Sequence, residues 1–378
     1  MAELALPQDL LLLYRECRLC PRRCGVDRTA DEVGVCREGV TLRVASVEAH
    51  MGEEPPISGV NGSGTVFFPG CSLRCIYCQN HQISHEGLGR QWNVGELVER
   101  LVALWKSPGI HNLNFVTPDH FLPHTVAVVQ ALRSRAIRIP ALYNLSGYQA
   151  LESLRLIEPV ADIYLADFKY ADATLAGRLS RCPDYAAVAL EALVEMVRQK
   201  GFLDSFLFDE DLERRCVDRS RSRPVAGRGV LVRHLILPGQ VENSRQVLDM
   251  LYVEFGRNLP LSLMSQYVPI REFPEAPFLN RTVTAEEFLQ VLEHAQGLGF
   301  SHLFVQYPEK TASDAHPFLP DFTSAVPFPE NATKPESERP SPDYAQVTCC
   351  DGGYGRPSLR PVGTVRRDAV GAASSRDE

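Results

Sequence analysis

Short apolar runs alternate with amphipathic stretches between residues 65 and 306, and this alternation predicts strands that are each followed by a helix. The run Leu113–Val116 is typical of a buried strand, and the stretch after Asn93 is typical of a helix that begins with a capping box. The predicted strands are 65–68, 113–116, 141–144, 163–168, 230–237, 261–267 and 301–306. The predicted helices are 93–106, 122–135, 151–156, 185–200, 244–255 and 284–298.

Serial strand–helix units predict an α/β fold with a parallel sheet, and right-handed crossovers would curl that sheet towards a barrel. In such folds the chemistry takes place at the C-terminal ends of the strands. Polar side chains recur at these predicted ends, where each one alone could equally be a loop residue or a helix cap. As a set they predict a binding site made of Thr117, Asn144, Ser146, Asp167, Lys169, Arg233 and His234.

Three cysteines follow the first predicted strand and its Pro-Gly turn, in the pattern C-x3-C-x2-C. They are Cys71, Cys75 and Cys78. A 4Fe–4S cluster takes one thiolate per iron, so three cysteines would leave one iron open to a substrate or cofactor. The alternative is a zinc site, which normally closes with a fourth Cys or His. His81 and His85 are near enough in sequence to close one.

A second group of cysteines precedes the predicted sheet, in the pattern C-x2-C-x3-C-x11-C. It consists of Cys17, Cys20, Cys24 and Cys36. Four cysteines in so short a stretch can surround one metal centre, and a second iron–sulfur cluster and a structural zinc ion both fit. The alternative is a set of free thiols. Within this stretch we expect Arg22 and Arg23 to be solvated.

Composition narrows the class of protein. The chain has 378 residues and a formal net charge of −8, which argues against nucleic-acid binding through a basic surface. No stretch is long and apolar enough to span a membrane, and the run Leu10–Leu13 lacks the basic flank of a signal peptide. Eleven cysteines without a secretion signal indicate metal ligands in a reducing cytoplasm. We therefore expect a cytoplasmic protein without nucleic-acid or membrane partners.

The sequence predicts three parts. Residues 1–40 form a Cys-rich metal-binding leader, and residues 41–308 form the barrel-like domain. Within the domain, residues 202–228 have a charged centre and are expected to be an exposed insertion on the N-terminal side of the sheet. Residues 309–378 are rich in Pro, Ser, Arg and Asp without apolar periodicity, so we expect a disordered tail.

The C-x3-C-x2-C motif, with Tyr77 before its last cysteine, resembles that of the radical S-adenosylmethionine superfamily. The motif ends in Cys-Gln-Asn, as in the pyruvate formate-lyase activating enzymes. The stretches 114–118, 143–148 and 232–239 resemble an uncharacterised branch called pyruvate formate-lyase activating enzyme-like. The sequence departs from the usual pattern of the activating enzymes at two places, and these departures leave the target open. Thr117-Pro118-Asp119 replaces the usual Gly-Gly-Glu, and Asn144 stands where an Asp is usual.

This resemblance implies a partial (β/α)6 barrel of the radical S-adenosylmethionine type with a Cys-rich N-terminal extension. It also implies an enzyme whose 4Fe–4S cluster cleaves S-adenosylmethionine to a 5′-deoxyadenosyl radical, which abstracts hydrogen from a target such as a protein glycine. Asn80 would lie near the methionine end of the cofactor, Tyr77 would pack on the adenine, and Lys169, in an Asp-x-Lys motif, would meet the carboxylate. Electrons would come from a low-potential reductant such as flavodoxin or ferredoxin.

Other functions explain fewer of these features. An iron–sulfur electron-transfer or cluster-carrier protein without cofactor cleavage would account for the cysteines alone. A zinc-stabilised interaction module would account for the leader but not for the barrel. Because the insertion is expected on the far side from the site, no lid is evident except the leader, and we favour a protein or peptide substrate over a small molecule.

Overall fold

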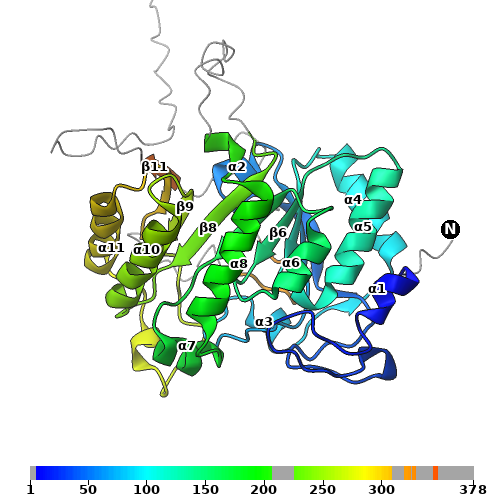
Figure 1. Cartoon of the computed structure of the whole chain (residues 1–378), viewed down its shortest axis with the longest axis horizontal. Coiled ribbons are helices and arrows are strands. Elements are labelled where there is room, and N and C mark those ends of the chain that lie inside the picture. The colour runs from blue at the N-terminus through cyan, green and yellow to red at the C-terminus, as the bar shows by residue number, and fades with distance from the viewer. Residues whose placement is uncertain (1–5, 207–224, 309–318, 325, 329–343, 348–378) are drawn as a thin grey trace, which may run out of the picture.

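A computed structural model describes residues 6–206, 225–308, 319–324, 326–328 and 344–347 (Figure 1). In these ranges nine strands form one sheet in the order β11-β10-β9-β8-β7-β6-β5-β3-β2. Seven consecutive members run parallel: β3 (Ser63–Phe67), β5 (Leu113–Val116), β6 (Ala141–Leu145), β7 (Ile163–Asp167), β8 (Gly229–Leu235), β9 (Leu261–Met264) and β10 (Leu303–Gln306). Antiparallel β2 (Ser46–His50) and β11 (Tyr344–Val347) form the two edges.

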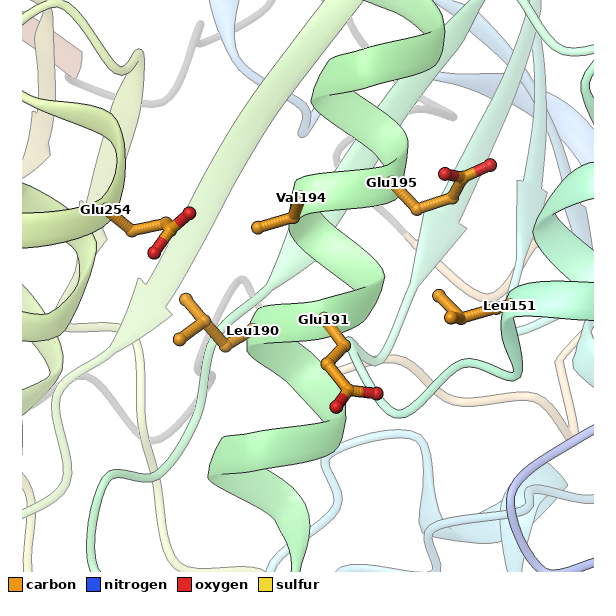
Figure 2. Close-up of a pocket in the computed structure, with 6 residues that line it drawn as sticks. All are labelled: Leu151, Leu190, Glu191, Val194, Glu195 and Glu254. Atoms are coloured by element: carbon orange, nitrogen blue, oxygen red, sulfur yellow. The ribbon is translucent and has the colours of Figure 1, made fainter.

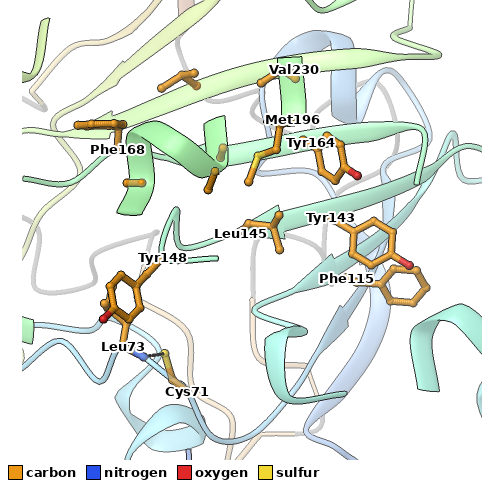
Figure 3. Close-up of a cluster of buried hydrophobic side chains, with 14 of the residues drawn as sticks. Cys71, Leu73, Phe115, Tyr143, Leu145, Tyr148, Tyr164, Phe168, Met196 and Val230 are labelled. Atoms are coloured by element: carbon orange, nitrogen blue, oxygen red, sulfur yellow. Dashed lines mark hydrogen bonds between the residues drawn. The ribbon is translucent and has the colours of Figure 1, made fainter. Parts of the chain in front are cut away.

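The helices between the strands pack on one face of the sheet, in front of the strands in Figure 1. They are α4 (Val94–Lys106), α5 (Leu122–Ser134), α6 (Leu151–Ile157), α8 (Tyr185–Lys200), α10 (Val241–Phe255) and α11 (Ala285–Leu298). The strand register brings a row of apolar side chains under them, which includes Phe115, Tyr143, Tyr164 and Val230, shown with Met196 of α8 in Figure 3. This row forms the main hydrophobic core.

The opposite face of the sheet, which we call the inner face, is lined by the alternate residues of the same strands. Leu142, Leu165, Leu231 and Phe304 form a second buried cluster there with Ile57 of α2 (Pro55–Ser58). Because both faces are covered, the strands are apolar on both sides, as is usual for parallel sheets.

The predicted strands and helices agree closely with the observed ones. The capping box of α4, for example, joins Asn93 and Glu96 as expected. The strand order is linear and sequential, so the described part of the sheet is open, with β2 and β11 at opposite edges. Two helices near the cysteine loop were not predicted, α3 (His81–Ser84) and α7 (Ala173–Ser180), because neither is long enough to show a clear apolar period. β1 (Arg43–Val44) and β4 (Arg90–Gln91) pair separately.

Part of the expected tail, residues 319–324 and 326–328, packs against the sheet. Phe328 is buried and lies 5.3 Å from Phe67 between ring centroids, and Phe322 packs on the same ring. An irregular segment needs no helical or strand period to bury aromatic side chains, so the composition argument missed it. The rest of the tail lies outside the described residues, apart from β11.

The described ends of the insertion are partly exposed, as expected, at Asp204, Val225, Gly227 and Arg228. Leu203 and Ala226, near its two ends, are buried in the inner-face cluster beside Ile57. Its charged centre, at 207–224, lies outside the described residues. Among the helices that are described, none combines the length and apolarity needed to cross a bilayer.

Candidate metal and cofactor site

The cysteine loop, residues 69–80, leaves β3 at the C-terminal edge of the sheet. Gly70 makes the first turn with φ at +78°, and a Cβ there would lie 2.6 Å from the carbonyl oxygen of Cys36. Glycine therefore serves two purposes: it adopts a left-handed conformation and lets the leader approach closely. The loop then carries three free thiols, of which Cys71 and Cys75 are buried and Cys78 is half-buried.

Each of the three sulfur atoms accepts a hydrogen bond. The backbone N–H of Leu73 lies 3.4 Å from Cys71 Sγ (Figure 3). Hydroxyl groups donate to the other two, from Ser180 to Cys75 at 3.0 Å and from Ser84 to Cys78 at 3.3 Å. Such bonds stabilise thiolate sulfur and tune the reduction potential of iron–sulfur clusters. Three elements thus supply the donors: the loop, α7 and α3.

Burial disfavours the charged form of the thiols in this loop. Burial raises the pKa of the Cys71 thiol, and burial followed by the nearby Cys75 does the same for Cys78, so thiolates here need positive charge beside them. Within the described ranges, no three Cys, His, Asp or Glu side chains converge as around one metal ion. That arrangement is not required by a 4Fe–4S cluster, whose thiolates each bind a different iron.

A positive charge lies near this loop, two residues after the end of β7. The Lys169 ammonium forms an ion pair with Asp167, and its side chain is 17% exposed. Burial by itself would lower the pKa of Lys169, but the Asp167 carboxylate and the nearby Cys75 and Cys78 sulfur atoms outweigh it and raise that pKa. The predicted Asp-x-Lys pair and the cysteine loop therefore come together at one edge of the sheet.

The two remaining residues of the motif differ in exposure. Tyr77 is buried, and its hydroxyl lies 2.8 Å from that of Tyr170, which in turn lies 2.7 Å from Ser180 Oγ. A chain of hydroxyl groups therefore connects Tyr77 to the donor of Cys75. Asn80 is half-buried at the start of α3, and its side chain makes no capping bond there.

The ends of β5 and β6 carry polar groups without partners. Thr117 has φ at +51° and donates its N–H to Asn144 O at 2.9 Å, while the Asn144 side chain is half-buried on the inner face. Within the described residues, Ser146 Oγ and both carboxylate oxygen atoms of Asp119 are buried without a hydrogen-bond partner. Burial raises the pKa of Asp119 to about 6. Unpaired buried polar groups are costly, and at a site they indicate a missing ligand.

Two predicted site residues are not brought to the cysteine loop. Arg233 points to the inner face and forms buried ion pairs with Glu53 and Glu54, just before α2. His234 points to the helical face, where its ring nitrogens lie 2.7 Å from Phe168 O and 2.9 Å from Ser244 Oγ. Burial lowers its pKa to about 4, so the ring is neutral. Their contacts are those of structural residues.

The leader packs against the cysteine loop through Arg22, which is not solvated as expected. Its guanidinium donates to the carbonyl oxygen atoms of Ser72, Arg181 and Ser180 at 2.9, 2.7 and 3.0 Å. Arg23 is solvated, in an exposed ion pair with Glu152. No local signal separates the two arginines, and none marks Ser180, because their partners are distant in sequence.

The leader cysteines are grouped but do not all face one point. A Cβ on Gly34 would lie 3.0 Å from Cys24 Sγ and 3.9 Å from Cys36 Sγ, so these two sulfur atoms flank one glycine. Burial raises the pKa of Cys20 and of Cys36, and in both cases the neighbouring Cys17 adds to the effect. The four thiols therefore share one region next to the cysteine loop, which contacts the leader at Gly70.

A separate hollow lies on the helical face (Figure 2). It is lined by Leu151, Leu190, Glu191, Val194, Glu195 and Glu254, from the start of α6 and from α8 and α10. None of these residues belongs to the predicted site, and the cysteine loop is not part of the lining.

Comparisons with known proteins give distant likenesses. No family model matches the chain. An uncharacterized protein of Methanocaldococcus jannaschii is 27% identical over 293 residues, which cover 75% of each chain. Among solved structures, the chain is similar to HydG, a maturase of the [FeFe]-hydrogenase, with a TM-score of 0.40 and 14% identity. That match covers 68% of this chain, which spans about half (54%) of the HydG chain.

Proposed function

We propose that this protein is a radical S-adenosylmethionine enzyme with a 4Fe–4S cluster on Cys71, Cys75 and Cys78. The observation that carries the proposal is the meeting of three free, hydrogen-bonded thiols of one loop with the Asp167–Lys169 pair at the C-terminal edge of a sequential parallel sheet. When bound, a reduced cluster supplies the electron that cleaves S-adenosylmethionine to a 5′-deoxyadenosyl radical.

The residues around the loop have distinct parts in this proposal. The Lys169 ammonium offers a charge-assisted hydrogen bond to the carboxylate of the cofactor. The unpaired carboxylate of Asp119 and the hydroxyl of Ser146 are suited to its ammonium group. The side chain of Asn80, two residues after Cys78, makes no capping bond to α3. Thr117 and Asn144 join the ends of β5 and β6 through one backbone hydrogen bond. Arg233 and His234 are left out because their polar groups are engaged elsewhere.

The leader is proposed to hold a second metal centre on Cys17, Cys20, Cys24 and Cys36, with iron–sulfur slightly preferred over zinc. The close approach of Gly70 to the Cys36 carbonyl supports a position for this centre beside the cysteine loop. A cluster there would offer a route for electrons from a reductant such as flavodoxin or ferredoxin. The target is proposed to be a protein or peptide, and a glycine of a partner protein is the candidate that the activating-enzyme resemblance supplies.

Anaerobic reconstitution with iron and sulfide tests the function. After reduction with dithionite, the parent protein should release 5′-deoxyadenosine from S-adenosylmethionine, and the Cys71→Ala/Cys75→Ala/Cys78→Ala variant should release none while its leader still binds metal. Cys216→Ala is the matched control, because Cys216 lies outside both cysteine groups in the sequence.

Two outcomes would contradict the proposal. Cofactor cleavage by the triple variant at the parent rate would refute the ligand assignment. A cluster that forms and is reduced without any cleavage would indicate an electron carrier. Iron, sulfide and zinc measured in the same samples show whether the leader holds a second metal centre. Iron and sulfide for a single cluster, with no zinc, would exclude one.

A further inference from the structure

The C-terminal segment, which we define as residues 319–324 and 326–328, lies against the inner face beside the cysteine loop. Phe328 contacts His50 and Phe67 at centroid distances of 4.5 and 5.3 Å, and Phe322 lies 5.3 Å from Phe67. Ile83 and Val116 complete the same buried cluster. We call the surface formed by His50, Phe67, Ile83 and Val116 the aromatic groove.

Hydrogen bonds to its main chain and to one side chain hold the C-terminal segment in the way in which a bound peptide is held. Gln82 Oε1 accepts the backbone N–H of Phe322 at 2.7 Å, and Gln82 Nε2 donates to Asp321 Oδ1 at 3.3 Å. Gln82 belongs to α3 and follows Cys78 by four residues. One glutamine therefore binds the main chain and an acidic side chain of the segment, while the groove receives two aromatic rings.

The inner face also carries buried polar side chains on β9 and β10. Gln306 is 4% exposed and Ser262 is fully buried, yet neither amide atom of Gln306 nor the Ser262 hydroxyl has a hydrogen-bond partner among the described residues. Ser262 is paired with Phe304, and Gln306 follows Phe304 by two, so all three side chains point to the inner face.

We propose that the aromatic groove is the docking site for a peptide segment of the substrate. Like residues 321–328, this peptide would carry an acidic residue directly before one aromatic residue and a second aromatic residue further along. In the resting protein the C-terminal segment occupies the groove as an intramolecular substitute, and the substrate displaces it. The role of this peptide as substrate rests on the proposed function, whereas docking does not. A tethered segment competes at a high effective concentration, so a free peptide binds well only when the segment is weakened.

Fluorescence anisotropy with a labelled peptide of residues 319–328 tests the groove on the full-length chain. The Phe322→Ala/Phe328→Ala variant should bind the peptide at least tenfold more tightly than the parent does. Val326→Ala is the matched control, because Val326 is exposed in the same segment, and it should behave as the parent. Asp321→Ala, also exposed, loses the contact with Gln82 together with the bonds that Asp321 Oδ1 accepts from the N–H and the hydroxyl of Thr323, and it should improve binding at least twofold.

A peptide in which both phenylalanines are alanine should not bind any of these proteins. Equal peptide affinity for the parent, the double variant and Asp321→Ala, or equal affinity for both peptides, would overturn the groove. The assay contains neither reductant nor S-adenosylmethionine, so its failure leaves the proposed function standing. Absence of cofactor cleavage in the separate assay would overturn that function and not the groove.

Discussion

Arg22 and Arg23 are adjacent in sequence and should differ sharply in their contribution to stability. Replacing Arg22 by Ala removes three hydrogen bonds of 2.7 to 3.0 Å to the carbonyl oxygen atoms of Ser72, Ser180 and Arg181, and also a bond of 2.8 Å to Cys182 Sγ and a longer one of 3.4 Å to Leu73 O. These bonds join the leader to the cysteine loop and to the end of α7. Arg23→Ala removes one ion pair whose side chains are 57% and 67% exposed.

The two changes should therefore have different costs. A net contribution of about 1 kcal/mol per hydrogen bond gives a loss of roughly 3 kcal/mol for Arg22→Ala, because the guanidinium is half-buried and water replaces only part of the contacts. Exposed ion pairs contribute about 0 to 1 kcal/mol, so Arg23→Ala should lie at or below that value. In thermal unfolding, the Arg22 variant should lose about 5 °C or more and the Arg23 variant less than about 2 °C.

Urea unfolding of anaerobically purified protein measures both losses, and hydrogen exchange locates them. Amides of residues 71–78 should exchange faster in the Arg22 variant than in the parent, and at the parent rate in the Arg23 variant. Equal unfolding free energies for the two variants would refute this prediction, because they would show that Arg22 does not hold the leader to the cysteine loop.

Two further predictions concern single side chains. Ser180→Ala removes the donor to Cys75 Sγ and should lower the reduction potential of the reconstituted cluster by on the order of tens of millivolts, measured by redox titration, while Ser153→Ala, which loses a bond to Leu19 O, should not. His234 has a folded-state pKa of about 4, depressed by burial, so its contribution to stability is complete above the unfolded value of 6.5 and is lost as pH falls towards 4. Between pH 7 and pH 4, the free energy of unfolding of the parent should therefore fall by up to about 3 kcal/mol more than that of His234→Gln, as measured by urea unfolding. Parallel pH profiles would contradict this.

The fold class and the positions of most elements could be predicted from local patterns. Apolar spacing reflects which side of a strand or helix is buried, so Leu113–Val116 and the helix after Asn93 were found with nearly their observed bounds. The cysteine loop could also be predicted, because its ligands lie within eight consecutive residues. Short α3 and α7 were missed since neither spans enough turns to show a period.

The sequence by itself determined the strand–helix units, the cysteine loop and the strand ends on which Asp167 and Lys169 lie. Only the tertiary structure decided which polar residues serve the site: it engaged Arg233 with Glu53 and Glu54, turned His234 to the helical face, and separated Arg22 from Arg23. It also placed Phe328 on Phe67. These contacts join residues far apart in sequence, and their energies depend on burial and on partners that no local period records.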